Sequence, residues 1–306
     1  MHSHAHGAGS TSRVLRIALI LTAAYILLLI AAGIRAHSLA LLSEAGHNVS
    51  DFLALLLSWA AAYIQERPPS TTKTFGYHRA GVLAAFVNAG TLVLIALFIF
   101  YEAVERFYNP VQVQPGIMMA VAAVGVVLNG GIAWLLMRSN SDLNIRSVLI
   151  HEIGDTLATL AVILGGIGIV LTGKNFIDPA LSILIGALIL WSSFGIIRES
   201  LNILLEGTPR GMELEQVEAE LRSVPGVNNV HDLHIWSIGS ETHALSCHIA
   251  IADIPPSESE AIMRQVRGML ADRFRIRHTT IQFEHVICDI AHGCIIIPEA
   301  EHRHTH

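Results

Sequence analysis

Two copies of a short pattern place metal-binding side chains inside apolar sequence. His47 lies four positions before Asp51, and His151 lies four positions before Asp155. A spacing of four puts two side chains on one face of a helix. Imidazole nitrogens and carboxylate oxygens are common ligands of Zn²⁺. Ionisable residues at the centre of a bilayer cost about 2.5–3.5 kcal/mol on insertion scales and usually serve a function. The two pairs therefore predict a metal site within a membrane.

The number of ligands indicates what the site does. Two such helices side by side supply two nitrogens and two oxygens, which complete a zinc tetrahedron and leave no position for a catalytic water. Protons compete with metal for these ligands. We expect His47 and His151 to accept the protons, because an unperturbed histidine titrates at a pH of about 6.5. The sequence has no GxxxxGK[ST] phosphate loop. The pattern thus favours exchange of Zn²⁺ for H⁺ over catalysis.

The elements that carry these pairs are predicted to be membrane helices. The chain has 306 residues, of which 52% are hydrophobic and 14% charged, whereas soluble domains have about 25% charged residues. A formal net charge of −6 provides no basic surface for nucleic acid. Apolar stretches of spanning length, about 20 residues, run near 15–34, 39–64, 81–107, 116–137, 147–171 and 176–200. The two pairs fall in the second and fifth stretches.

Lysine and arginine predict the orientation of the helices. They are concentrated near the amino terminus, in the 65–80 and 138–146 connections and after residue 200. Cytoplasmic segments carry the excess of these residues. We therefore expect a multi-pass protein with both termini in the cytoplasm. The short outside loops and the absence of a transit peptide favour a bacterial inner membrane.

The depth of the two pairs presents a conflict. At about 1.5 Å per residue, His47 lies about 12 Å from the outer end of its stretch, and His151 about 6 Å from the inner end of its own. In a hydrocarbon core about 30 Å thick the pairs would miss each other by about 10 Å. Either the fifth helix begins before Arg146, or the expected boundaries are wrong by one turn.

The chain changes character after Glu206. Residues 212–224 and 257–274 have the spacing of amphipathic helices, and residues 227–238, 243–253 and 279–287 resemble strands. The order helix, strand, strand, helix, strand predicts a small two-layer α+β domain. We expect a histidine-containing tail at 1–13, six transmembrane helices in 14–206, the α+β domain at 207–290, and a tail with histidine and cysteine at 291–306.

The motifs resemble one known family. The paired His-x-x-x-Asp pattern, FGYHRAG at 75–81 and HDLHIW at 231–236 are similar to those of the cation diffusion facilitators, and the resemblance runs from about Leu15 to His285. It implies a homodimer that exchanges Zn²⁺, or a related divalent metal such as Cd²⁺, Co²⁺ or Ni²⁺, for H⁺ across a lipid bilayer without an organic cofactor. It also implies a cytoplasmic αββαβ domain. The transport site would consist of His47, Asp51, His151 and Asp155, and histidine at its first position is typical of the zinc-selective branch.

The resemblance implies further metal ligands outside the membrane. His231 and His248 match cytoplasmic ligands of some members, with Glu284 as the third ligand, although Gln282 and Glu284 stand where those members have histidine and aspartate. The alternative is a pair of strand histidines held by hydrogen bonds. Further candidate metal ligands are His78 and a cluster of side chains in the tail. That cluster consists of Cys288, His292 and Cys294. Arg79 and Glu206 match a salt bridge that links the membrane part to the soluble part.

Two other functions are considered beside transport. His151-Glu152-x-x-Asp155 superficially resembles the helix of a zinc protease, which gives an intramembrane metalloenzyme. A membrane metal sensor, or a non-transporting subunit, is the other alternative. All four transport-site residues are present, which favours the transporter.

Overall fold

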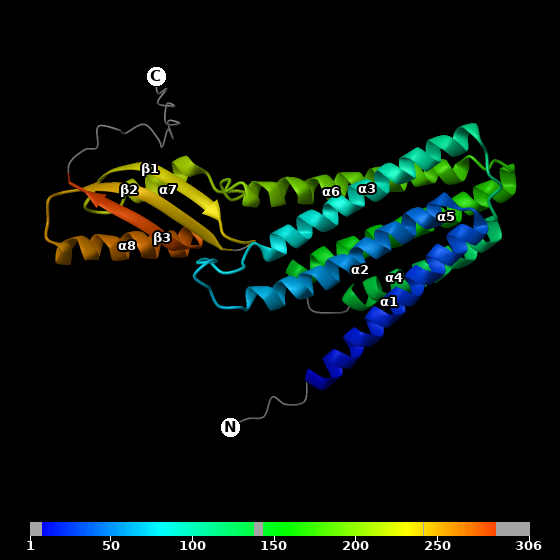
Figure 1. Ribbon diagram of the computed structural model, residues 1–306, viewed down its shortest axis with the longest axis horizontal. Coiled ribbons are helices and arrows are strands. Elements are labelled where there is room, and N and C mark those ends of the chain that lie inside the picture. The colour runs from blue at the N-terminus through cyan, green and yellow to red at the C-terminus, as the bar shows by residue number, and fades with distance from the viewer. Residues whose placement is uncertain (1–7, 138–142, 241, 286–306) are drawn as a thin grey trace, which may run out of the picture. The chain divides into compact units, whose positions relative to one another are not determined.

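The computed structural model describes residues 8–137, 143–240 and 242–285, apart from the side chains of residues 8–19, 135, 136, 143–148 and 151. Six long helices come first, and a short domain of two helices and three strands follows (Figure 1). The chain forms two compact units, Met1–Ala60 with Ala84–Ile197, and Ala61–Leu83 with Arg198–His306. This element order confirms the predicted fold class.

Each of the six apolar stretches forms one helix. Their bounds are Ala8–Ala36 for α1, Leu39–Gln65 for α2, Ala80–Tyr108 for α3, Pro115–Met137 for α4, Leu143–Thr172 for α5 and Ile177–Leu204 for α6. Within the described residues, α3 to α6 each contain a stretch long and apolar enough to cross a membrane. The hydropathy of α2 is lowered by its polar residues, which include Glu44, His47 and Asp51.

The helices bury apolar side chains between them and also carry apolar side chains on the outside. Leu29, Leu41, Met118 and Val162 are fully buried and come from four different helices. On the outside, many large apolar side chains of the six helices are exposed, and Trp191, for example, is 85% exposed. A folded water-soluble domain rarely exposes so large an apolar surface, whereas lipid tails accept it.

The fifth helix is longer than the sequence analysis expected. It begins at Leu143, before Arg146, and has 30 residues, which corresponds to about 45 Å. A helix of this length exceeds a hydrocarbon core of about 30 Å. Of the two explanations offered for the mismatch of about 10 Å between the His/Asp pairs, the structure therefore agrees with the first, in which the fifth helix begins before Arg146.

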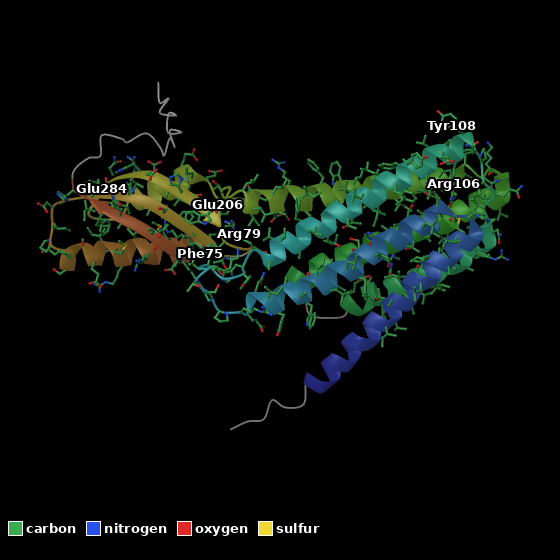
Figure 2. The ribbon with its side chains drawn as sticks, in the orientation of Figure 1. Phe75, Arg79, Arg106, Tyr108, Glu206 and Glu284 are labelled. Atoms are coloured by element: carbon green, nitrogen blue, oxygen red, sulfur yellow. The ribbon has the colours of Figure 1, made fainter. Side chains whose placement is uncertain are left out.

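A buried carboxylate fixes the start of α2. Asp178, in the first turn of α6, accepts hydrogen bonds from the Ser38 hydroxyl at 2.6 Å and from the backbone N–H groups of Leu39 at 2.6 Å and Ala40 at 3.2 Å. Arg106, near the end of α3 (Figure 2), lies 3.5 Å from the same carboxylate and donates to the His37 carbonyl at 2.6 Å. The contact joins three helices at the end where α2 begins.

Asp178→Ala is expected to destabilise the six-helix unit by about 2–3 kcal/mol, because buried donors lose their acceptor. Thermal unfolding of the detergent-solubilised protein would measure the loss. Asp178→Asn, which keeps one acceptor oxygen, should lose less. Equal stability of the alanine variant and the unmodified protein would contradict the assigned role of this carboxylate.

The soluble domain is a three-stranded sheet with two helices. Its elements are α7 (Leu214–Arg222), β1 (Val227–Ser237), β2 (His243–Ile251), α8 (Pro256–Phe274) and β3 (Ile276–Glu284). The strand order is β1-β2-β3, with β1 antiparallel and β3 parallel to β2. The expected αββαβ order is thus confirmed, and β3 begins three residues earlier than the predicted strand.

Alternation along β2 separates the two faces of the sheet. Leu245, Cys247 and Ile249 are buried in the core that α7 and α8 share with the sheet. Successive strand residues point to opposite faces. His248 therefore lies on the face away from that core.

Candidate metal sites

The first cluster of metal-binding side chains lies between α2 and α5. His47 and Asp51 come from successive turns of α2, and Asp155 comes from α5. The Nε2 atom of His47 lies 3.0 Å from Asp155 Oδ1 and 3.5 Å from Asp51 Oδ2. One donor atom from each of the three residues lies within 4.8 Å of the others. The structure thus brings together side chains that are more than a hundred positions apart in sequence.

Other predicted ligands lie outside what the structure describes. The backbone of His151 belongs to α5, one turn before Asp155, but its side chain is not among the described ones. Cys288, His292 and Cys294 follow the last described residue. These four residues stay predictions.

The cluster between α2 and α5 lines a cavity of about 440 Å³. Glu44 and Asn88 contribute further polar groups to its wall, and the rest is mainly apolar, including Leu92 and Ile189. In apolar surroundings carboxylates require a compensating positive charge or a proton. The cavity can therefore hold a divalent cation and exchange it for protons.

Glu44 is a polar group of the cavity that the sequence analysis missed. Its Oε1 atom lies 2.7 Å from the hydroxyl of Thr159, and the same hydroxyl lies 2.8 Å from the backbone carbonyl of Asp155. The available signal was the spacing of three between Glu44 and His47 within an apolar stretch, which places both on one side of a helix.

A second cluster lies on the face of the soluble sheet opposite to its core, and its side chains are partly buried. His231 of β1 and His248 of β2 are direct cross-strand partners. Their rings lie 5.3 Å apart at an angle of 82°. Glu284 of β3 completes the group, again with one donor atom from each residue within 4.8 Å of the others. Three neighbouring strands thus supply the three predicted cytoplasmic ligands.

Glu284 lies between the two histidines. Its Oε1 atom is 3.0 Å from His248 Nδ1 and its Oε2 atom is 3.1 Å from His231 Nε2. Both ring nitrogens of His231 are buried and form no hydrogen bond with a described residue. Two imidazoles facing one carboxylate are donors that Zn²⁺ accepts, and an imidazole nitrogen without a hydrogen bond fits a metal ligand.

Two neighbouring side chains orient the second cluster. Gln282 donates a hydrogen bond of 2.9 Å to Glu284 Oε1. Asp232, whose φ of 51° lies at the irregularity of β1, places a carboxylate oxygen 3.8 Å from His248 Nε2. A carboxylate on the far nitrogen of a metal-binding histidine fixes the ring and its tautomer. Gln282 thus supports the cluster without being counted among its ligands.

The thiol of Cys247 belongs to the core rather than to either cluster. Burial raises its pKa to about 12, and the nearby charge of Asp232 acts in the same direction. The thiolate is the form that binds metal and reacts with electrophiles. At neutral pH this cysteine is therefore neither a good ligand nor a good nucleophile.

Alkylation of Cys247 by a maleimide is expected to be at least about a hundredfold slower in the folded protein than in denaturant, because the folded thiol is buried and protonated. Mass spectrometry of the peptide that contains residue 247 would follow the reaction at pH 7. Equal rates in both states would contradict the burial of this thiol.

His78 lies at a packing contact and not in either cluster. Its backbone carbonyl accepts a hydrogen bond of 3.2 Å from Gln65, and a Cβ atom added to Gly239 would meet the same carbonyl at 3.1 Å. Among the described residues, His78 joins no group of three or more metal-binding side chains. The next residue, Arg79, forms an ion pair of 3.0 Å with Glu206 (Figure 2).

Comparison with known families matches nearly the whole chain. The model of the cation efflux transmembrane domain matches residues 15–205, and that of the cation efflux protein cytoplasmic domain matches residues 209–286. The metal-bound C-terminal domain of the CzcD transporter of Cupriavidus metallidurans is 40% identical, and the match covers 24% of this chain and 99% of that structure with a TM-score of 0.22.

Three curated relatives align over most of their length. A cadmium, cobalt and zinc/H(+)-K(+) antiporter of Bacillus subtilis is 37% identical over 99% of this chain and 98% of its own. The zinc transporter ZitB of Escherichia coli is 38% identical over 94% and 93%. The metal cation efflux system protein CzcD of Cupriavidus metallidurans is 38% identical over 95% and 92%.

Proposed function

Because this chain belongs to the cation efflux family, the cation diffusion facilitators, we propose that it exports Zn²⁺ from the cytoplasm in exchange for protons. The chain is a transporter and not an enzyme, so the comparison of residues 151–155 with a protease helix is set aside. The names of the relatives support Cd²⁺ and Co²⁺ as additional substrates, and we retain Ni²⁺ as a further candidate.

The cluster of His47, Asp51 and Asp155 is the observation that carries this proposal. Nitrogen and carboxylate ligands suit Zn²⁺ and the related divalent metals. With His151 as the fourth ligand the coordination shell would be closed, which suits an ion that is held and released. The short distances between the three donors support a common metal centre.

Protons drive the release of the cation in this mechanism. The histidine must be neutral and the carboxylates ionised to bind metal, so proton uptake weakens binding. Alternation between inward-open and outward-open arrangements then exposes the site to each side in turn, and each arrangement is favoured by the ligand that binds it better. The H(+)-K(+) antiport in the name of the Bacillus relative supports a monovalent cation gradient as the energy source.

The soluble domain is proposed to be a cytoplasmic dimerisation and metal-sensing domain. The cytoplasmic-domain family match supports its location, and the distribution of Lys and Arg supports cytoplasmic termini in an inner membrane. A metal held by His231, His248 and Glu284 would favour the dimer arrangement that binds it better. This proposal also includes the division of the chain near residue 206 and metal binding by Cys288, His292 and Cys294 in the tail.

Transport by purified protein in sealed proteoliposomes tests the function. A zinc gradient should drive zinc uptake together with an opposite change of internal pH, and an impermeant fluorescent indicator for each ion would record both. Zinc binding without any flux would favour the metal sensor instead. Zinc flux without a pH change would exclude proton exchange.

A further inference from the structure

Glu44 is a buried carboxylate outside the four residues of the proposed transport site. Its side chain is 1% exposed. One carboxylate oxygen accepts the Thr159 hydroxyl at 2.7 Å. The other oxygen, Oε2, is buried and has no hydrogen-bond partner among the described residues. Burial of a carboxylate oxygen without a partner costs free energy. A bound cation beside this atom would remove that cost.

Glu44 lines the same cavity as the proposed transport site. It lies three residues before His47 on α2, and its partner Thr159 lies four residues after Asp155 on α5. His47 contacts Asp155, and Glu44 contacts Thr159. The second contact lies backwards along α2 from the first, but forwards along α5. The two helices are therefore antiparallel here, and Glu44 is displaced by about one helical turn, about 5 Å, from the site.

The displacement is towards the end of the bundle where α2 begins. In the proposed orientation this end faces away from the cytoplasm. Fully buried apolar side chains lie along the same part of the helices, including Leu41 on α2 and Val162 on α5. Glu44 thus lies between the proposed site and the end of the bundle where α2 begins, on the side where the helices are packed.

The hydroxyl oxygen of Tyr25 lies close to Glu44 and Thr159. The hydroxyl of Tyr25 is buried, has no hydrogen-bond partner among the described residues, and is within electrostatic range of the Glu44 carboxylate. A Cβ atom added to Gly125 would overlap this hydroxyl and lie 3.0 Å from Thr159 Cγ2, so Tyr25 and Thr159 are neighbours. Carboxylate and hydroxyl oxygens are donors for a cation.

We propose that Glu44 is a release-side ligand of the transported divalent cation, which passes from the nitrogen-and-oxygen site to an oxygen-only position formed by Glu44 Oε2 and the Tyr25 hydroxyl. This proposal rests on the proposed export function. Oxygen-only ligands hold Zn²⁺ less firmly than a set that includes imidazole, and ions leave a transport path only from sites that bind them weakly. Glu44 therefore affects the rate of release more than the affinity of the primary site.

Glu44→Gln tests this role because it keeps the size of the side chain and an acceptor for Thr159 while it removes the charge. We expect equilibrium zinc affinity within about threefold of the unmodified protein, and zinc turnover in proteoliposomes at least about tenfold lower. Glu44→Asp, which keeps the charge, should restore most of the turnover. Ser193→Ala is the matched control. It removes another buried oxygen that has no hydrogen-bond partner in the described part of the chain, and Ser193 does not line the cavity.

Two results would overturn the release-side role. One is unchanged turnover of Glu44→Gln, and the other is an equal loss of affinity and turnover, which would make Glu44 part of the primary site. Absence of zinc flux in the unmodified protein would instead refute the export function. That result is distinct from any effect of residue 44.

Labelling of the unmodified protein provides a test that does not depend on a variant. Dicyclohexylcarbodiimide reacts with buried carboxyl groups, and mass spectrometry would identify the labelled peptide. Zinc should protect Glu44 at concentrations above those that saturate the primary site. If the extent of Glu44 labelling were the same at every zinc concentration, the proposal would be contradicted.

Discussion

Asp155→Ala is expected to lower zinc flux by at least about a hundredfold, since even the loss of a residue that only orients a metal ligand costs up to that factor. Asp155 lies 3.0 Å from His47. Among the described side chains, it is the one that α5 contributes to the group of three donors, and the other two come from α2. Removal of its carboxylate also leaves His47 and Asp51 without a carboxylate from the second helix. Initial rates of zinc uptake into proteoliposomes would measure the effect.

The control for Asp155→Ala is a carboxylate on the same helix. Glu152 belongs to α5 and lies outside the group of three donors. Glu152→Gln should keep most of the flux, and both variants should elute at the same size as the unmodified protein. Undiminished flux in Asp155→Ala would remove the cluster as the transport site, whereas a change in elution would point to misfolding.

Glu284→Ala is expected to abolish the stabilisation of the soluble domain by zinc. A ligand present at about 100 times its Kd stabilises the state that binds it by about 2.7 kcal/mol. Glu284 lies within 3.1 Å of a nitrogen of each histidine, so its loss removes the donor that β3 contributes beside the histidines of β1 and β2. Hydrogen exchange of the full-length protein, with and without zinc, would report protection of the peptides from these strands.

Gln282→Ala serves as the graded comparison for Glu284→Ala. It removes the 2.9 Å hydrogen bond to Glu284 but leaves all three donors. The affinity for zinc should fall by about tenfold, as is usual when a supporting residue is lost. Zinc protection that is the same in Glu284→Ala as in the unmodified protein would show that these strands bind no metal through this carboxylate.

Much of the fold follows from local patterns in the sequence. Six apolar stretches predict six helices because a membrane span requires about 20 apolar residues with every backbone group paired. The alternation of apolar residues in the last hundred positions predicts two helices and three strands, and the structure confirms their order. The pairs of histidine and aspartate were visible because four residues make about one turn of a helix.

Local patterns in the sequence did not show the contacts between different helices and strands. The depth of His151 and Asp155 depended on where α5 begins, and apolarity does not mark that residue because the helix extends beyond its apolar part. The meeting of Glu284 with His248 depended on the register between β2 and β3, which sets the cross-strand neighbours of each residue. Asp178 was unremarked because the backbone groups that it caps belong to α2.

By itself the sequence determined the helices, the order of the soluble elements, the family and the types of donor atoms, because these properties depend on residues that are close along the chain. Only the tertiary structure shows the distances between donors from different elements. The family resemblance anticipated Asp155 with His47 and Glu284 with two histidines, whereas the contact of Glu44 with Thr159 appeared only in the structure. Such meetings depend on the lengths, directions and packing of whole helices and strands. They involve residues up to 115 positions apart, and no local pattern contains that information.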